Sequence, residues 1–369
     1  MKIAKLLALA AAVLLLPSCA QRTQKGGKID QSTGRMTLEY AEQFSVDYYG
    51  EAALVSVGEE ACCWLTPEGT EAPDLPGVPV LHPPLNHLYL ASSAAMDPFC
   101  KLGAMENVRF TGTKAEDWSL EEVASAMEAE KLLYAGKYRA PDYELLLSEG
   151  CSLAVENTMI LHSPAVREQL EALGIPVIVE RSSYESHPLG RLEWIKLYGL
   201  LVGKASEAEA YFEQQTASLR DIFSAEPTGK SLAFFYVSPN GYINVRRPGD
   251  YLTRMVELSG GIYVPEGLSG KSSGEGSVMS LQPEAFYAGA RDADVLIYNG
   301  NIYEVTSLVQ LLEMCELLSD FKAVRERNVW VTEQNLFQET SAIGGMIADF
   351  HTVLNGTTEN RLTYLHRLT

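Results

Sequence analysis

The chain has 369 residues and a net charge of −19, from 29 Lys and Arg against 48 Asp and Glu. This acidic balance argues against a nucleic-acid partner, whose phosphates require a basic protein surface. A hydrophobic content of 46% is sufficient for packed cores. The length is typical of two domains rather than one.

The N-terminus has the features of a secretory signal. Two lysines precede an apolar run over 6–16 that is too short to span a bilayer. The four residues that end at Cys19, Leu-Pro-Ser-Cys, resemble the lipobox of bacterial lipoproteins, in which the cysteine is acylated. This resemblance implies a signal peptide over 1–18, lipidation of Cys19 and a polar tether over 19–35. A plain signal peptide with an incidental cysteine is the alternative.

Five further cysteines are scattered along the body, at Cys62, Cys63, Cys100, Cys151 and Cys315. They form no CxxC pair, which argues against a zinc site or a redox motif. We expect most of them to be small buried apolar residues. One disulfide is an alternative in an exported protein, and the sequence does not choose its partners.

From residue 88 the chain alternates short β-rich runs with helical patterns. Strands are predicted over 88–93, 108–112, 151–155 and 176–180, and helices over 94–103, 119–133 and 163–174. Ser119 and Glu122 have the spacing of a capping box at the start of the second helix. Strands and helices that alternate through short links predict a parallel sheet. We therefore expect an N-terminal α/β lobe over 36–186.

The pattern then changes, because no strand is predicted over roughly the next 40 residues. Apolar residues suit one long helix that is buried on more than one side; they are Leu192, Ile195, Leu197, Leu200 and Leu201. Such a strand-free stretch is unusual inside a compact α/β lobe. We interpret residues 187–206 as a helix between two lobes.

The α/β alternation resumes in a C-terminal lobe over 207–369. Strands are predicted over 232–237, 242–246, 293–298 and 329–331, the last of these being the final strand. Asp250 is the expected cap of a helix that ends at Gly260 and Gly261, and another helix starts at Ser341. The fold class is therefore α/β, with two Rossmann-like lobes joined by a single long helix.

Three segments of this pattern resemble one known family. Residues 141–155, 187–204 and 280–298 are similar to the substrate-binding proteins of ATP-driven (ABC) importers for ferric siderophores, haem and cobalamin. The segment over 187–204 is the most specific, and the resemblance covers roughly residues 50 to 356. It implies that Glu144 and Glu284, one on each lobe, dock to arginines of the membrane permease. A carboxylate that merely solvates or caps a helix start is the alternative for each residue.

The resemblance also implies a ligand cleft between the lobes, at the carboxyl ends of the strands. The candidate ligand residues of the first lobe are Lys137, Tyr138 and Arg139, and those of the second lobe are Tyr242, Arg246 and Arg247. Further candidates are Ser92, Ser93, Thr113, Lys114, Tyr303, Phe337 and the loop 269–277. Arginine binds planar anions and tyrosine covers apolar bulk, which suits a large anionic chelate. Solvated surface charge is the alternative for Arg246 and Arg247.

We expect the cargo to be an iron complex, with haem or a corrinoid as the alternative. The protein is expected to be a monomeric, non-enzymatic binding protein that needs no cofactor of its own. An exported α/β metalloenzyme would use His82, His87 or His187, although no catalytic motif accompanies them. A lipoprotein that scavenges haem without a transporter is a third possibility.

Overall fold

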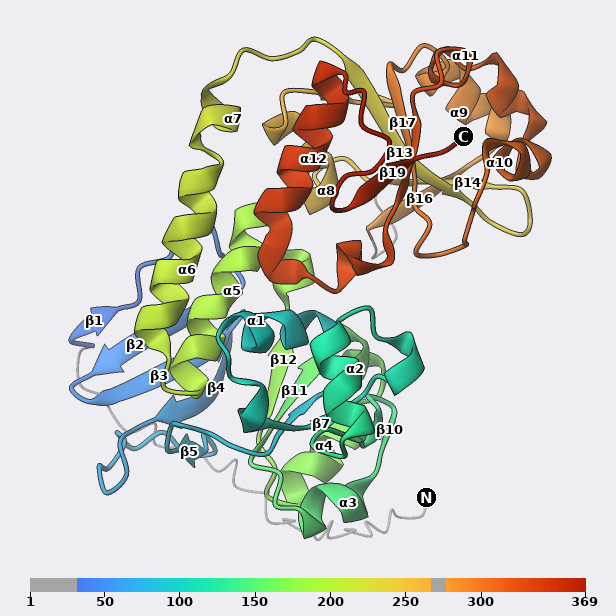
Figure 1. Ribbon diagram of the computed structural model, residues 1–369. Coiled ribbons are helices and arrows are strands. Elements are labelled where there is room, and N and C mark those ends of the chain that lie inside the picture. Colours follow the sequence, from blue (N-terminus) through green and yellow to red (C-terminus); the bar gives the residue numbers. More distant parts are fainter. Residues whose placement is uncertain (1–31, 267–276) are drawn as a thin grey trace, which may run out of the picture.

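The computed structural model describes residues 32–266 and 277–369, which form two α/β lobes joined by helices (Figure 1). The predicted signal peptide, Cys19 and most of the predicted tether lie outside the described residues, as does most of the 269–277 loop. Within the described ranges, no helix combines the length and the apolar character that crossing a membrane requires.

The first lobe begins with a five-stranded sheet that the sequence analysis did not predict. Its strands follow one another in the order β1-β2-β3-β4-β5, antiparallel except for the last pair. They are β1 (Gly34–Arg35), β2 (Phe44–Tyr49), β3 (Ala52–Val57), β4 (Glu60–Leu65) and β5 (Val80–Leu81). The two tight turns use Gly50 and Gly58 at φ +64° and +58°, a conformation that glycine adopts without steric cost.

A parallel sheet forms the rest of this lobe, in the order β12-β11-β6-β7-β8, as the alternation of strands and helices predicted. Its strands are β6 (Leu88–Leu90), β7 (Val108–Thr111), β8 (Leu133–Tyr134), β11 (Leu153–Asn157) and β12 (Val177–Glu180). Its helices are α1 (Met96–Lys101), α2 (Glu121–Glu128), α3 (Tyr143–Ser148) and α4 (Pro164–Ala172). A small hairpin of β9 (Gly136–Lys137) and β10 (Ala140–Pro141) leads from β8 into α3.

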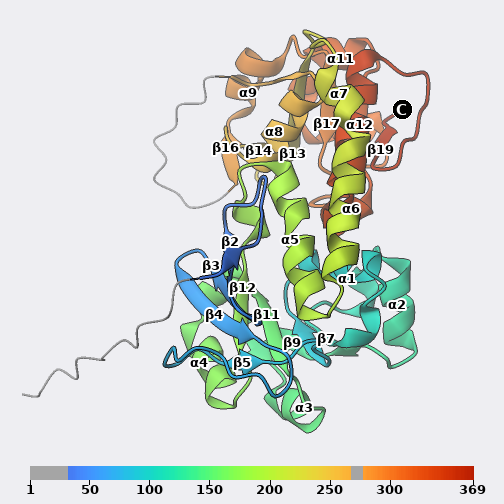
Figure 2. The same cartoon turned by 90° about the vertical axis from the view of Figure 1, so that its left-hand side faces the viewer.

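Three helices, α5 (Pro188–Leu201), α6 (Ala205–Ser218) and α7 (Arg220–Ser224), connect the lobes. Within the range predicted as one long helix, α5 ends at Leu201 and the chain reverses at Gly203, where φ is +72°. Helices α5 and α6 then lie side by side (Figure 2). They approach closely because Gly199 has no side chain; a Cβ there would lie 2.5 Å from the Cβ of Ala208.

The second lobe has a mixed sheet in the order β16-β14-β13-β17-β18-β19, with β15 beside β13. Its strands are β13 (Ser231–Val237), β14 (Ile243–Arg246), β15 (Ile262–Tyr263), β16 (Val278–Leu281), β17 (Val295–Tyr298), β18 (Val329–Thr332) and β19 (Leu365–Arg367). Its helices are α8 (Tyr251–Leu258), α9 (Pro283–Ala290), α10 (Leu308–Met314), α11 (Lys322–Arg325) and α12 (Ile343–Asn355). The strand predicted over 329–331 was expected to be the last, but β19 follows it in the chain and pairs antiparallel with β18.

The helix starts test two predictions about capping. Asp250 caps α8 as predicted, since its Oδ1 accepts the backbone N–H of Leu252 at 2.9 Å. The predicted capping box at Ser119 is wrong, because α2 starts at Glu121 without a side-chain cap. The backbone N and Oγ of Ser119 instead donate to Oε1 of Gln338, in the second lobe, at 2.8 and 2.7 Å.

The two lobes share one hydrophobic core. A single cluster of buried side chains includes Phe99 of α1, Leu197 of α5, Met255 of α8 and Ile347 of α12. Polar contacts support this packing, such as the backbone N–H of Ser341, which donates to the buried carboxylate of Asp97 at 2.7 Å. The loops after β6 and β7 make such contacts, so the carboxyl ends of the first parallel sheet face the second lobe.

Candidate functional site

A pocket of about 520 Å³ lies between the two lobes. Its first wall comes from residues that follow β11 and β12, and its second wall from the turn between β14 and α8. The lining residues are Thr158, Met159, Ser183, Tyr184, Glu185, Ser186, Arg247, Pro248, Gly249, Asp250, Tyr251 and Ser277. Strand ends of this kind are where open α/β sheets bind ligands.

The first-lobe wall presents exposed apolar side chains. Met159 and Tyr184 are 47% and 53% exposed, which is high for large apolar side chains. Asn157, at the end of β11, accepts the backbone N–H of Met159 at 2.9 Å and so fixes the turn that carries it. Such exposed apolar surface in a concave site suits the apolar bulk of a ligand.

The second-lobe wall is positively charged at Arg247. Its Nε donates to the backbone carbonyl of Val278 at 3.1 Å, which holds the side chain at the pocket. Its neighbour Arg246 donates from Nη1 to Oγ of Ser277 at 3.0 Å and lies 3.8 Å from the carboxylate of Asp250. Burial raises the pKa of Asp250, and the charge of Arg246 opposes that shift.

The carboxylates that line the pocket already have partners. Asp250 serves the helix cap and Arg246, as described above. Glu185 accepts the backbone N–H groups of Glu42 and Gln43 at 2.8 and 3.0 Å, together with the indole N–H of Trp194 at 2.8 Å. No carboxylate in the described ranges pairs with Arg247, so this guanidinium remains available to a ligand.

The structure brings only part of the predicted ligand set to this pocket. Arg247 lines it, and Arg246 lies beside it with Cζ 5.4 Å from the ring of Phe337. Lys137 and Arg139 are exposed on the β9–β10 hairpin and Tyr138 is half-buried there. That hairpin follows β8, at the opposite edge of the first parallel sheet from β12, so these three residues do not line the pocket.

Tyr242 belongs to a second, smaller hollow of about 390 Å³ at the carboxyl end of β13. It shares this hollow with Tyr236, Tyr303 and a floor of Ser and Asn side chains. The rings of Tyr236 and Tyr303 are 6.1 Å apart, and Oγ of Ser280 donates to Asn244 at 2.6 Å. This hollow is aromatic and uncharged, unlike the pocket beside Arg247.

The other first-lobe candidates have structural partners. Ser92 is buried and its Oγ donates to Glu180 at 3.1 Å, while Lys114 pairs with Glu116 at 3.5 Å. Ser93 and Thr113 are half-buried in the loops that follow β6 and β7, and neither lines the pocket.

The two predicted docking residues lie at exposed helix starts on different lobes (Figure 1). Glu144 is in the first turn of α3 and Glu284 is in the first turn of α9. Glu144 does not cap its helix, because Asp142 accepts the backbone N–H of Leu145 at 3.0 Å. No ion pair involves either residue among the described parts of the chain.

The histidines considered for a metalloenzyme have structural roles. Nδ1 of His82 lies 3.1 Å from Oγ1 of Thr66, and Nδ1 of His87 lies 2.7 Å from the carbonyl of Glu149. His187 is the N-cap of α5. In residues 32–266 and 277–369, no three His, Cys, Asp or Glu side chains are placed to hold a metal ion. The five cysteines in these ranges are free thiols.

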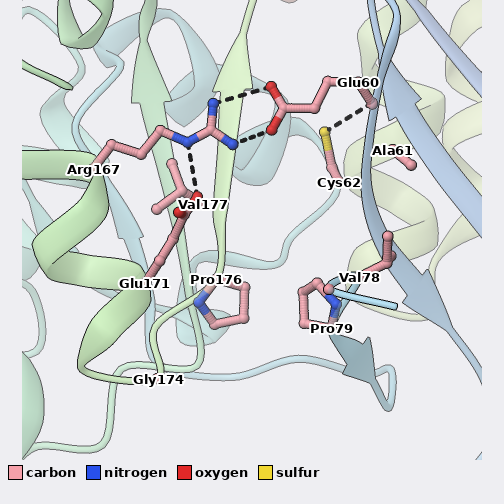
Figure 3. Close-up of a pocket in the computed structure, with 11 residues that line it drawn as sticks. Glu60, Ala61, Cys62, Val78, Pro79, Arg167, Glu171, Gly174, Pro176 and Val177 are labelled. Atoms are coloured by element: carbon pink, nitrogen blue, oxygen red, sulfur yellow. Dashed lines mark hydrogen bonds and ion pairs between the residues drawn. The ribbon is translucent and has the colours of Figure 1, made fainter. Parts of the chain in front are cut away.

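Another hollow, of about 510 Å³, lies inside the first lobe between β4 and α4 (Figure 3). Arg167 crosses its rim and donates to Glu60 at 3.0 Å and to Glu171 at 2.8 Å. Pro79 and Pro176 face each other below this ion pair. The three charged side chains that line this hollow, Glu60, Arg167 and Glu171, are therefore paired with one another.

Sequence reasoning missed the first-lobe wall of the inter-lobe pocket. Met159 and Tyr184 follow two strands that were predicted, over 151–155 and 176–180. The rule that places ligands at strand ends, applied to these two strands as well, would have found both residues.

Comparisons with known proteins agree with this architecture. No family model matches the chain. The structure is similar to the periplasmic heme-binding protein HutB of Vibrio cholerae, with a TM-score of 0.58 and 16% identity, over 72% of this chain and 99% of that one. It is similar to the petrobactin-binding protein YclQ of Bacillus subtilis, with a TM-score of 0.58 and 16% identity, over 74% of this chain and 94% of that one. The chain has the fold of ABC-importer substrate-binding proteins.

A curated relative is an uncharacterized lipoprotein of Methanocaldococcus jannaschii, 23% identical over 233 residues. The match covers 59% of this chain and 53% of that protein, so the chain spans about half the length of the curated relative. HutB and YclQ, which share the substrate-binding fold, are binding proteins and not enzymes. The inter-lobe pocket lies at a domain interface, a common position for small-molecule sites in proteins.

Proposed function

We propose that this protein is an exported, lipid-anchored binding protein that captures an iron complex between its lobes and delivers it to an ABC importer. The observation that carries the proposal is the inter-lobe pocket, with an exposed apolar wall on one lobe and Arg247 on the other. Although the chain has a net charge of −19, no carboxylate among the described residues pairs with Arg247 at this pocket, which suits an anionic ligand. Haem or a corrinoid is the alternative cargo.

Export and anchoring are supported by the N-terminal sequence and by the lipoprotein relative. We propose a signal peptide over 1–18, acylation at Cys19 and a tether over 19–35. The proposed lobes are 36–186 and 207–369, with the connecting helix over 187–206. The body is proposed to be a monomer, with no cofactor beyond its cargo.

Ligand capture is tested by visible absorption of the purified protein titrated with haemin, cobalamin and a panel of ferric chelates. We expect saturable binding to one class, and Arg247→Ala should weaken it about tenfold because a charge-assisted hydrogen bond is lost. The control is Arg220→Ala, which removes an exposed arginine of α7 remote from the pocket. If a folded protein binds no member of the panel, the proposed cargo is wrong.

Delivery is tested by reversing charge at Glu144 and Glu284. Both are exposed and free of ion pairs among the described residues, so the variants should fold normally. We expect Glu144→Lys with Glu284→Lys to abolish uptake by cells while ligand binding is retained. The matched controls, Glu168→Lys and Glu359→Lys, alter one exposed glutamate on each lobe and should transport normally. Unchanged uptake in the double variant would instead favour scavenging without a transporter.

A further inference from the structure

Two tyrosines that line the inter-lobe pocket each carry an arginine against the ring. In the first lobe, Cζ of Arg181 lies 5.2 Å from the centroid of Tyr184. Across the pocket, Cζ of Arg191, from α5, lies 4.1 Å from the centroid of Tyr251. Both distances are typical of cation–π contacts. The same pairing therefore occurs on both walls of one pocket.

These two guanidinium groups form no ion pair with another described residue. The Nε atoms of Arg181 and Arg191 are buried, and neither has a hydrogen-bond partner among the described residues. No carboxylate in residues 32–266 and 277–369 forms an ion pair with either arginine. Arg191 is only 9% exposed. Arg181 is half-buried, and the charge of Arg191 opposes the rise in the pKa of Asp250, a carboxylate of the same pocket. A ligand anion that reached Arg181 and Arg247, neither of which has a carboxylate partner in the described ranges, would be stabilised by charge-assisted contacts.

The tyrosines differ in how much of the ring a ligand can reach. Tyr184 is 53% exposed, whereas Tyr251 is only 8% exposed. Arg181 packs against the turn of the β3–β4 hairpin, where a Cβ on Gly58 would lie 2.9 Å from its Nη1. The guanidinium is therefore held in place, and Tyr184 is the main stacking surface.

We propose that this pocket takes a planar aromatic group that carries negative charge, stacked on Tyr184 and bordered by Tyr251. A cation against one face of a ring withdraws electron density from it, which favours stacking with an electron-rich anionic ring. Arg247 adds a further positive charge at the same pocket. This inference rests on the proposed function and narrows its cargo to catecholate chelates or porphyrins, in preference to hydroxamate and carboxylate chelates.

The test compares four probes by quenching of tryptophan fluorescence: ferric 2,3-dihydroxybenzoate, haemin, ferric citrate and ferric acetohydroxamate. The first two are aromatic anions, citrate supplies the charge without the ring, and the acetohydroxamate complex lacks both. We expect the protein to bind 2,3-dihydroxybenzoate or haemin, and whichever of them binds identifies the source. Tyr184→Leu should weaken that binding about three- to tenfold, the range of an aromatic pair, while Tyr184→Phe retains it.

Tyr303→Leu is the matched control, because Tyr303 is an exposed tyrosine of the second hollow and lies outside the proposed site. Equal or tighter binding of ferric citrate or acetohydroxamate would overturn the stacking proposal and leave the proposed function intact. A Tyr184→Leu variant that binds the aromatic probes normally would do the same. Binding of none of the four probes by a folded protein would overturn the stacking proposal, and failure to bind cobalamin as well would overturn the proposed function.

Discussion

The start of α5 holds a buried carboxylate whose removal should destabilise the whole protein. Glu193 is completely buried, and its oxygens accept the backbone N–H groups of Glu39, Tyr40 and Ala41 at 2.8 to 3.0 Å. Nζ of Lys196 lies 3.0 Å from the same carboxylate. The carboxylate of Glu193 therefore makes most of the hydrogen bonds between the connecting helix and the segment before β2, to which Lys196 adds one at the carbonyl of Thr37.

Glu193→Gln keeps the shape of the side chain and removes its charge. Each hydrogen bond to a charged group contributes about 1.5 to 3 kcal/mol, and the new amide N–H₂ cannot accept from the backbone. Breaking one partner of a buried ion pair costs about 3 to 5 kcal/mol. Because Lys196 keeps Glu209 at 3.0 Å, we expect a loss near the lower end, about 3 kcal/mol in the free energy of unfolding.

Urea unfolding followed by tryptophan fluorescence measures this loss. The control is Glu209→Gln, which removes the other partner of Lys196, a carboxylate that is 49% exposed. We expect that variant to lose less than about 1 kcal/mol, as is usual for exposed ion pairs. The reasoning fails if Glu193→Gln loses less than about 1 kcal/mol, or if both variants lose the same amount.

Three further outcomes are expected. Burial raises the pKa of Glu156 to about 8, and neither of its oxygens has a partner among the described residues. The folded protein therefore keeps Glu156 protonated up to about pH 8, whereas the unfolded chain releases this proton near pH 4.5. Because folding then requires uptake of a proton, the free energy of unfolding should fall as pH rises from about 4.5 to 8. Glu156→Met should remove this decline and raise the free energy of unfolding by about 2 kcal/mol at pH 7.5. Urea unfolding at several pH values checks this, and a variant that still loses stability between pH 4.5 and 8 would contradict it. Gly199→Ala should lower the free energy of unfolding by about 1 to 3 kcal/mol, because the new Cβ would clash with Ala208 and lie 2.8 Å from the carbonyl oxygen of Lys204. The expected result is a lower melting temperature than that of the unmodified protein. Opening of the lobes should be small because they share a core, so a clear change in radius of gyration on ligand binding, measured by solution scattering, would contradict this.

The sequence predicted the parts of the fold that depend on local pattern. Most strands of the first parallel sheet, the central strands of the mixed sheet and the cap at Asp250 follow from periodicity and helix-start chemistry. The N-terminal sheet escaped notice because its turns use single glycines, Gly50 and Gly58, without the Asn-Gly or Asp-Gly pairs that mark hairpins. Ser119 was misinterpreted because its true partner, Gln338, lies in the other lobe.

The candidate site was harder to predict, because its chemistry depends on contacts between distant segments. Arg247 could be predicted as a ligand residue because it directly follows a predicted strand. The contact between Arg191 and Tyr251 could not, because these residues belong to two helices far apart in the sequence. Lys137 and Arg139 were nominated by the same strand-end rule, yet their strand lies at the far edge of the sheet. Strand order, which the sequence pattern does not specify, decides which strand ends form the pocket.

The core that the lobes share also governs the order in which this protein can mature. Helix α12, residues 343–355, packs against α5, α6 and α8 and is synthesised after all three of them. Until it arrives, apolar residues of the connecting helices such as Leu197 remain without their full set of neighbours. The core shared by the lobes therefore cannot be completed before α12 is made, and a truncation just before residue 343 should make the connecting helices more open to proteases.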